Sequence, residues 1–177
     1  MVNIFTEGFP QDEKQMAASH IANEGERKYL LDEIPDYASL INAGLRIPGP
    51  IKNNEYLSEI FECGFKDFIS NFDIKKRVVW DVATGPEAFA IVNSDAQIVK
   101  TAAVKFENEN PLGEIFDIDV YIVHGDTLGS LNRKDLHLQP RKCLICDKTA
   151  EECIRERNHS VEELQAHISK LINDYKK

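Results

Sequence analysis

Two aspartates two positions apart, Asp117 and Asp119, lie inside an apolar, β-branched stretch at residues 111–123. Successive side chains of a β-strand point to opposite faces, so a strand here places both carboxylates on one face. The other face then receives Phe116, Ile118, Val120 and Ile122. Two like charges side by side on a largely buried strand repel each other and are costly to desolvate. A divalent cation such as Mg²⁺, which takes oxygen ligands and is often shared with a substrate phosphate, would relieve that cost.

The metal hypothesis competes with a simpler one, because a D-x-D pair on a surface strand is commonly a solvated face. The Ile, Val, Phe and Tyr neighbours of the pair and the glycine-containing turn before it favour the metal. In nucleotidyltransferases of the polymerase-beta type, such a pair on a strand holds Mg²⁺ against a triphosphate and orients the attacking hydroxyl. A third carboxylate is often needed there, and Asp81, Glu87 and Glu114 are the candidates.

Four cations are candidates for contacting phosphates: Lys52, Lys100, Arg133 and Arg141. Each of them alone fits a solvent-exposed charge equally well. Residues 131–148 contain five Lys and Arg against two Asp, although the whole chain has a net charge of −9. Arg133 and Arg141 belong to this basic segment, and the planar guanidinium fits phosphate in a bidentate way. The segment therefore suits a small anionic ligand or an acidic partner.

Three cysteines and a histidine follow the pattern Cys143-x2-Cys146-x6-Cys153-x5-His159. The first pair has the spacing of a zinc knuckle, and the full set offers the Cys₃His ligands of a closed structural zinc site. His159 directly precedes Ser160, a predicted helix cap, so the start of a helix would fix its position. The alternative is a cluster of reduced cysteines packed in a small core. Cys63 stands apart and fits an ordinary free thiol.

The composition, with 177 residues, 42% hydrophobic and 29% charged, indicates one soluble globular domain. We expect a single domain over residues 1–177, with residues 141–177 appended as a Cys/His segment and helix. No apolar run approaches the ~20 residues needed to cross a bilayer, and the first ten residues lack a signal-peptide pattern. We therefore expect a cytoplasmic protein with reduced cysteines. Its acidic charge argues against a general nucleic-acid binder.

The elements that must position these residues alternate along the chain. Helices are predicted over residues 10–33, from Asn53 or Asn54 to residue 72, from a Ser94 cap to residue 107, and after Ser160. Strands are predicted over residues 38–47, 77–83, 88–92, after Gly113 and over 127–132, with a turn at 84–87. The last strand would return antiparallel and carry Arg133 toward the carboxylates. The predicted class is α+β, a small mixed or antiparallel sheet with packed helices.

Four motifs occur in order: I-P-G-P-x-K at 47–52, T-G-P-E at 84–87, P-L-G-x3-D-x-D-V at 111–120 and R-K-C-x2-C-x6-C-x-R-x3-H-S at 141–160. Together they resemble the CitX family, the apo-citrate lyase phosphoribosyl-dephospho-CoA transferases or holo-citrate lyase synthases. The resemblance covers nearly the whole chain from about residue 10.

This resemblance implies a nucleotidyltransferase-like fold and activity. Such enzymes move 2′-(5″-triphosphoribosyl)-3′-dephospho-CoA onto a serine of the citrate lyase acyl carrier subunit and release pyrophosphate. The matching motifs then make Lys52, Gly85, Glu87 and Gly113 substrate-binding residues, beside the phosphate-binding Lys100, Arg133 and Arg141. Asp117 and Asp119 would hold Mg²⁺.

Two positions depart from the family pattern, in which arginine follows the glycine of P-L-G and histidine precedes its proline. Here those positions hold Glu114 and Asn110. Glu114 either points away from the site, adds a metal ligand or alters activity. The competing hypothesis is therefore a divergent, non-catalytic module that binds a citrate lyase subunit or carrier protein. A transferase acting on another carrier protein is a third.

Overall fold

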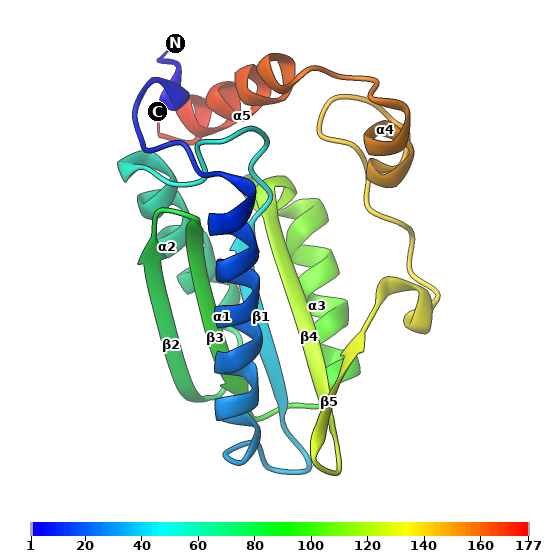
Figure 1. Cartoon of the computed structure of the whole chain (residues 1–177). Helices are drawn as coiled ribbons and strands as arrows, with labels where there is room; N and C mark the ends of the chain where they lie inside the picture. The colour runs from blue at the N-terminus through cyan, green and yellow to red at the C-terminus, as the bar shows by residue number, and fades with distance from the viewer. Residues whose placement is uncertain (1, 177) are drawn as a thin grey trace.

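The computed structural model describes residues 2–176, and these form a five-stranded antiparallel sheet with helices on both faces (Figure 1). The strands are β1 (Ser39–Leu45), β2 (Ile74–Val82), β3 (Gly85–Val92), β4 (Phe116–His124) and β5 (Thr127–Leu131), in the order β2-β3-β1-β4-β5. The helices are α1 (Glu13–Leu31), α2 (Glu55–Ile69), α3 (Ala96–Glu109), α4 (Ala150–Glu156) and α5 (Val161–Tyr175). Short 3-10 turns cover Ile4–Thr6, Gly113–Ile115 and Arg133–Leu136. The predicted α+β class with an antiparallel sheet is confirmed.

One face of the sheet is buried under α2 and α3. The apolar stripe of α2 points at the inward-facing side chains of β4, and Phe61 stacks on Phe116 with ring centroids 5.7 Å apart. Phe106 of α3 meets the same Phe116 ring edge-on at 5.4 Å. Phe116, Ile118 and Val120 are fully buried. The apolar half of the D-x-D strand is thus fixed by the core, which turns both aspartates to the opposite face.

The opposite face is covered over part of its area by α1. Leu30 and Ile34 pack on Leu40, Phe89 and Ile91 at the C-terminal end of the helix. The N-terminal half of α1 stands instead over polar residues of β1, β3 and β4. This leaves the sheet face open at one end.

Several local predictions needed correction. The turn predicted at 84–87 is a two-residue turn at Ala83 and Thr84, and β3 begins at Gly85, so Glu87 is a strand residue. Gly85 has φ +127°, a conformation that glycine adopts without strain and that lets the hairpin close. The cap of α3 is Asp95 rather than Ser94, because the Asp95 carboxylate accepts from the Gln97 N–H. Helix α4 was not predicted.

The C-terminal segment returns to the main core. Ile168 and Ile172 of α5 join the same hydrophobic cluster as α2, and a capping box at Ser160 and Glu163 starts the helix as predicted. Helix α4, which precedes α5 in the chain, stands to the side of the sheet (Figure 1). The division into one domain with residues 141–177 as an appendage stays a prediction. Within residues 2–176 there is no helix long and apolar enough to cross a membrane.

Candidate active site

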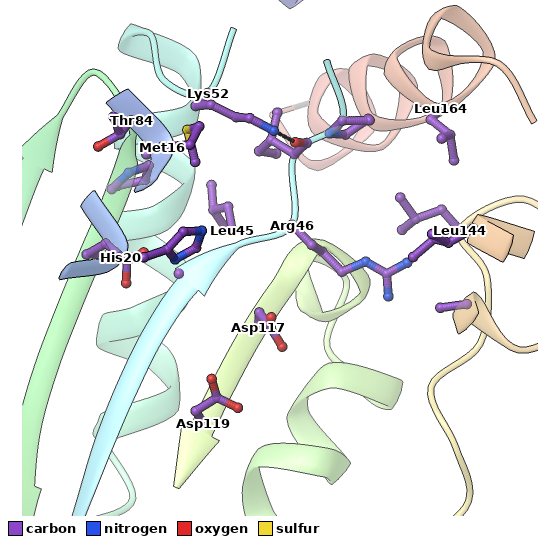
Figure 2. A pocket seen from close by; sticks show the side chains of 18 of the residues that line it. Met16, His20, Leu45, Arg46, Lys52, Thr84, Asp117, Asp119, Leu144 and Leu164 are labelled. Atoms are coloured by element: carbon purple, nitrogen blue, oxygen red, sulfur yellow. Dashed lines mark hydrogen bonds between the residues drawn. The ribbon is translucent and has the colours of Figure 1, made fainter. Parts of the chain in front are cut away.

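A pocket of about 1130 Å³ opens at the uncovered end of the sheet. Its walls are the N-terminal half of α1, the segment after β1, the β2–β3 turn and the Cys/His segment around α4. Asp117 and Asp119 of β4 lie on its floor (Figure 2). The geometry agrees with the sequence-based prediction that both carboxylates share one face of the strand.

The strand register sets the floor of the pocket. Gly44 of β1 is paired with Glu87 on one side and with Asp117 on the other, and Asn42 is paired with Asp119. A Cβ atom on Gly44 would lie 3.2 Å from the Glu87 Oε1. The missing side chain lets the Glu87 carboxylate lean over β1 toward the aspartates.

The aspartates lie in an electrostatically unfavourable place. The Asp119 side chain opens into the pocket, yet the surrounding walls desolvate it, and this desolvation together with the Asp117 charge raises its pKa. A positive charge near the pair would oppose the shift. Within residues 2–176, however, no third Asp or Glu lies close enough to Asp117 and Asp119 to complete a compact metal site like that of the three cysteines and His159. Mg²⁺ would thus take two protein carboxylates and complete its coordination with phosphate and water.

Glu87 anchors a hydrogen-bonded network against α1. Its Oε2 accepts from Asn42 Nδ2 at 2.7 Å, and Asn42 Oδ1 accepts from Arg27 Nη1 at 2.7 Å. Asn23 of α1 also donates to the carboxylate. Burial raises the pKa of Glu87, partly offset by the two asparagine contacts.

Three cations lie in or beside the pocket. Arg141 Nη2 lies 3.2 Å from Asp117 Oδ1. Lys52 lines the pocket and donates to the Ile47 carbonyl at 2.6 Å, and burial lowers its pKa. Arg46 extends across the pocket from the end of β1 (Figure 2). Of the predicted cations, Lys52 therefore lines the pocket, together with Arg46. Arg141 contacts Asp117 without being among the described lining residues.

Lys100, Arg133 and Gly113 are missing from the described residues that line the pocket. They stabilise the edge of β4 where β5 has ended. Lys100 Nζ donates to the Ile118 carbonyl at 3.0 Å, and Glu107 Oε1 accepts from the Ile118 N–H at 2.9 Å. Arg133 forms an ion pair with Glu107. Buried backbone groups at a strand edge need such partners.

Gly113 has a packing role in this arrangement. A Cβ atom at this position would lie 2.0 Å from the Phe106 carbonyl oxygen, far inside van der Waals contact. Glycine is therefore required where the turn before β4 passes α3. Gly113 is not among the described residues that line the pocket, so its contact with substrate stays a prediction.

Cys143, Cys146, Cys153 and His159 converge, with one ligand atom from each lying within 4.8 Å of all the others. The Cys146 and Cys153 sulfurs are 3.4 Å apart, and His159 Nε2 is 3.3 Å from Cys146 Sγ. Ligand atoms on a tetrahedral zinc lie about 3.5–3.8 Å apart, so the residues fit this ion. Burial and the neighbouring sulfurs raise the pKa of Cys153 to about 11. A bound cation would favour the thiolate instead.

The two departures from the family pattern both point away from the pocket. Glu114 Oε1 lies 2.9 Å from His167 Nε2 on α5, and it is not among the lining residues. Asn110 Nδ2 donates to Asp67 on α2 at 2.7 Å. Glu114 is therefore a surface contact between a turn and a helix.

Sequence reasoning missed Arg27, Asn42 and Arg46. Asn42 carried a usable signal, since it is the polar residue inside the apolar run of β1 and shares the face of Gly44. Arg46 carried none, because it follows the strand and its direction depends on the chain turn that comes next.

Comparison with known proteins gives a consistent result. The sequence model of one family, described as "CitX: Apo-citrate lyase phosphoribosyl-dephospho-CoA transferase", matches residues 14–175. A "Probable apo-citrate lyase phosphoribosyl-dephospho-CoA transferase" of Streptococcus pyogenes serotype M3 is 35% identical over 150 residues, covering 83% of this chain and 78% of its own. The Citrobacter koseri "Apo-citrate lyase phosphoribosyl-dephospho-CoA transferase" is 32% identical over 143 residues, covering 76% and 75%.

"Protein CitXG" of Leuconostoc mesenteroides subsp. cremoris is 34% identical over 155 residues. The match covers 85% of this chain but 32% of that longer protein.

Proposed function

Because the chain belongs to the CitX family of apo-citrate lyase phosphoribosyl-dephospho-CoA transferases, we propose that it is a nucleotidyltransferase of citrate lyase maturation. Its donor substrate is 2′-(5″-triphosphoribosyl)-3′-dephospho-CoA, and its acceptor is a serine of the citrate lyase acyl carrier subunit. We expect the reaction to take place in the cytoplasm.

In the proposed reaction, the serine oxygen bonds to the α-phosphorus, the bond from that phosphorus to the pyrophosphate oxygen breaks, and the serine proton is released. Bound Mg²⁺ supplies positive charge to the phosphate oxygens. Asp117 and Asp119, on the floor of the pocket, would hold that ion. Arg141, Lys52 and Arg46 bind the other phosphate oxygens. The acceptor brings the nucleophile, so this chain needs no nucleophilic side chain.

One observation supports this proposal most strongly. A carboxylate pair lies on the floor of a pocket that Lys52 and Arg46 also line, and Arg141 contacts Asp117. Desolvation and the Asp117 charge raise the pKa of Asp119. Among the described residues, the one ion pair of the two aspartates is that of Asp117 with Arg141. The two carboxylates are therefore not fully neutralised by the cations of this chain. A metal–triphosphate complex presents cationic charge to the aspartates and anionic charge to the arginines.

We propose a structural role for zinc at the Cys₃His cluster. Four protein ligands leave no open position for substrate, which is typical of a structural site. Arg141 precedes Cys143 by two residues, and the Arg141 carbonyl accepts from the Ala150 N–H at 2.9 Å. Zinc would therefore hold the hairpin that carries Arg141 to Asp117.

The competing function is a module that binds a citrate lyase subunit without catalysis. The specific observation in its favour is that no third carboxylate lies close to the Asp117 and Asp119 pair within residues 2–176. The Glu114 position no longer favours it, because that side chain contacts His167.

Transfer is tested with purified protein, the triphosphoribosyl precursor, apo carrier subunit and Mg²⁺, measuring pyrophosphate release and the mass of the carrier. We expect release that depends on Mg²⁺ and is at least about a hundredfold lower in Asp117→Asn and Asp119→Asn, as expected for losing several kcal/mol of metal stabilisation. Asp126→Asn, in the exposed β4–β5 turn, is the matched control and should keep wild-type activity. Carrier binding without release by the wild type would support the module instead.

A further inference from the structure

The two ends of the pocket differ in chemistry. At the end nearest the Cys/His segment, Arg46 lines the pocket. Arg141 is not among the described lining residues, but its guanidinium contacts Asp117 on the pocket floor. At the end beneath α1, Glu87 presents a carboxylate held by two asparagines. An elongated substrate with an anionic end and a hydroxyl-bearing end therefore has a preferred direction in this pocket.

Arg46 has little internal compensation for its charge. It forms no ion pair with a carboxylate of residues 2–176, and its one hydrogen bond runs from Nη1 to the Lys142 carbonyl at 3.4 Å. Figure 2 shows the guanidinium reaching across the pocket toward Leu144. A half-buried guanidinium with one long hydrogen bond has free donors that face the pocket.

Arg141 adds a like charge beside Arg46. Burial and the charge of Arg141 both lower the pKa of Arg46, and the charges of Asp117, Cys143 and Glu107 oppose this shift. Arg141 itself is held by Glu107 and Asp117. An anion between the two guanidinium groups would relieve their repulsion, and a polyphosphate offers bidentate oxygens to both.

Glu87 makes the α1 end unsuitable for phosphate. Its carboxylate accepts from Asn42 and Asn23, and it lines the pocket. A carboxylate repels phosphate but accepts hydrogen bonds from the vicinal hydroxyls of a ribose, as in dinucleotide sites. Strands lie about 4.8 Å apart, so Glu87 and Asp117, two strands apart on the floor, place their Cα atoms about 10 Å apart. A ribose 5-phosphate spans such a separation.

Asn23 supports a ligand at this end. Its side chain is 93% buried, its relative exposure being 7%, and its Oδ1 has no hydrogen-bond partner. Buried amide oxygens are rarely left unpaired. A hydroxyl donor arriving beside Glu87 would supply a partner once the side chain adjusts.

We propose that the substrate lies with its β- and γ-phosphates on Arg46 and Arg141 and its ribose hydroxyls on Glu87. The α-phosphate then sits over Asp117 and Asp119 between them. Pyrophosphate leaves on the Cys/His side, and the dephospho-CoA arm runs beneath α1. This orientation rests on the proposed function.

The test uses two fragments of the substrate, one from each side of the bond that breaks. Binding of pyrophosphate and of 2′-(5″-phosphoribosyl)-3′-dephospho-CoA is measured by calorimetry, with Mg²⁺, in the wild type, Arg46→Gln and Glu87→Gln. We expect Arg46→Gln to weaken pyrophosphate about tenfold or more and the ribosyl fragment less than twofold. Glu87→Gln should give the reverse pattern.

Arg157→Gln is the matched control, because Arg157 lines the same pocket at the Cys/His end. An equal loss of pyrophosphate binding in Arg157→Gln and Arg46→Gln would show general charge attraction and overturn the proposal. Unchanged pyrophosphate binding in Arg46→Gln, or no binding of either fragment to the wild type, would also overturn it. Arg46→Lys, which keeps the charge and the fold, should recover part of the affinity. Fragment binding requires no carrier and no transfer, so failure of the proposed reaction leaves this readout intact.

Discussion

Glu107 of α3 and Arg141 of the Cys/His segment form an ion pair that connects the candidate site to the fold. Glu107 is almost fully buried and also pairs with Arg133 and with the Ile118 N–H. Arg141 in turn donates to the Phe116 carbonyl at 2.6 Å and lies 3.2 Å from Asp117. One buried carboxylate thus fixes the edge of β4 and the arginine that reaches its first aspartate.

Replacing Glu107 should therefore cost stability. Glu107→Gln leaves Arg133 without its counter-charge and Arg141 with Asp117 alone, and we expect a loss of about 3 kcal/mol in the free energy of unfolding. Urea unfolding measures it. Glu109→Gln, on the same helix, is the control, because Glu109 is exposed and its contact with Lys105 is long at 3.9 Å. That change should stay within about 0.5 kcal/mol, and a similar loss in both variants would contradict the assigned role of Glu107.

Neutralising Asp119 should stabilise the protein even though it removes activity. Its pKa is raised above the ordinary value of 3.8, so the folded state binds this proton more tightly than the unfolded state. The ionised carboxylate therefore costs stability at neutral pH, and that cost disappears as pH falls through the raised pKa. We expect Asp119→Asn, without metal, to melt higher than the wild type at neutral pH, with the difference shrinking in acid. A lower melting temperature, or a constant difference across pH, would be inconsistent with this.

The Cys/His cluster should contain close to one zinc per chain after purification without chelator. Cys153→Ser removes one ligand and should lower the zinc content and the melting temperature together. Cys63→Ser is the control, because Cys63 is an exposed free thiol on α2 and should leave both unchanged. Mass spectrometry of the native protein and metal analysis check this. Wild-type protein without any bound metal would show that the cluster is a packed group of thiols.

Glu114→Gln separates a surface contact from a metal ligand. Both Glu114 and His167 are about one-third exposed, so losing their contact should cost at most about 1 kcal/mol. Pyrophosphate release should remain within twofold of the wild type, since the side chain lies outside the pocket. A fall in activity comparable with that of Asp119→Asn would place Glu114 in the metal site.

The sequence determined the features that local periodicity encodes. Alternation in β4 put Asp117 and Asp119 on one face, the helical spacing of Leu57, Ile60 and Phe61 marked the core helix, and the cysteine spacing marked the cluster. These patterns depend on neighbours a few residues apart.

Tertiary structure decided which charges meet. Lys100 and Arg133 were, like Arg141, candidates for contacting phosphate, but α3 and the end of β5 place them at the edge of β4, whereas Arg141 reaches Asp117. Glu114 found its partner 53 residues away on α5, and Arg46 gained its direction from the chain after β1. A charged side chain takes its role from the groups that folding brings within a few ångströms, and no local pattern specifies those groups.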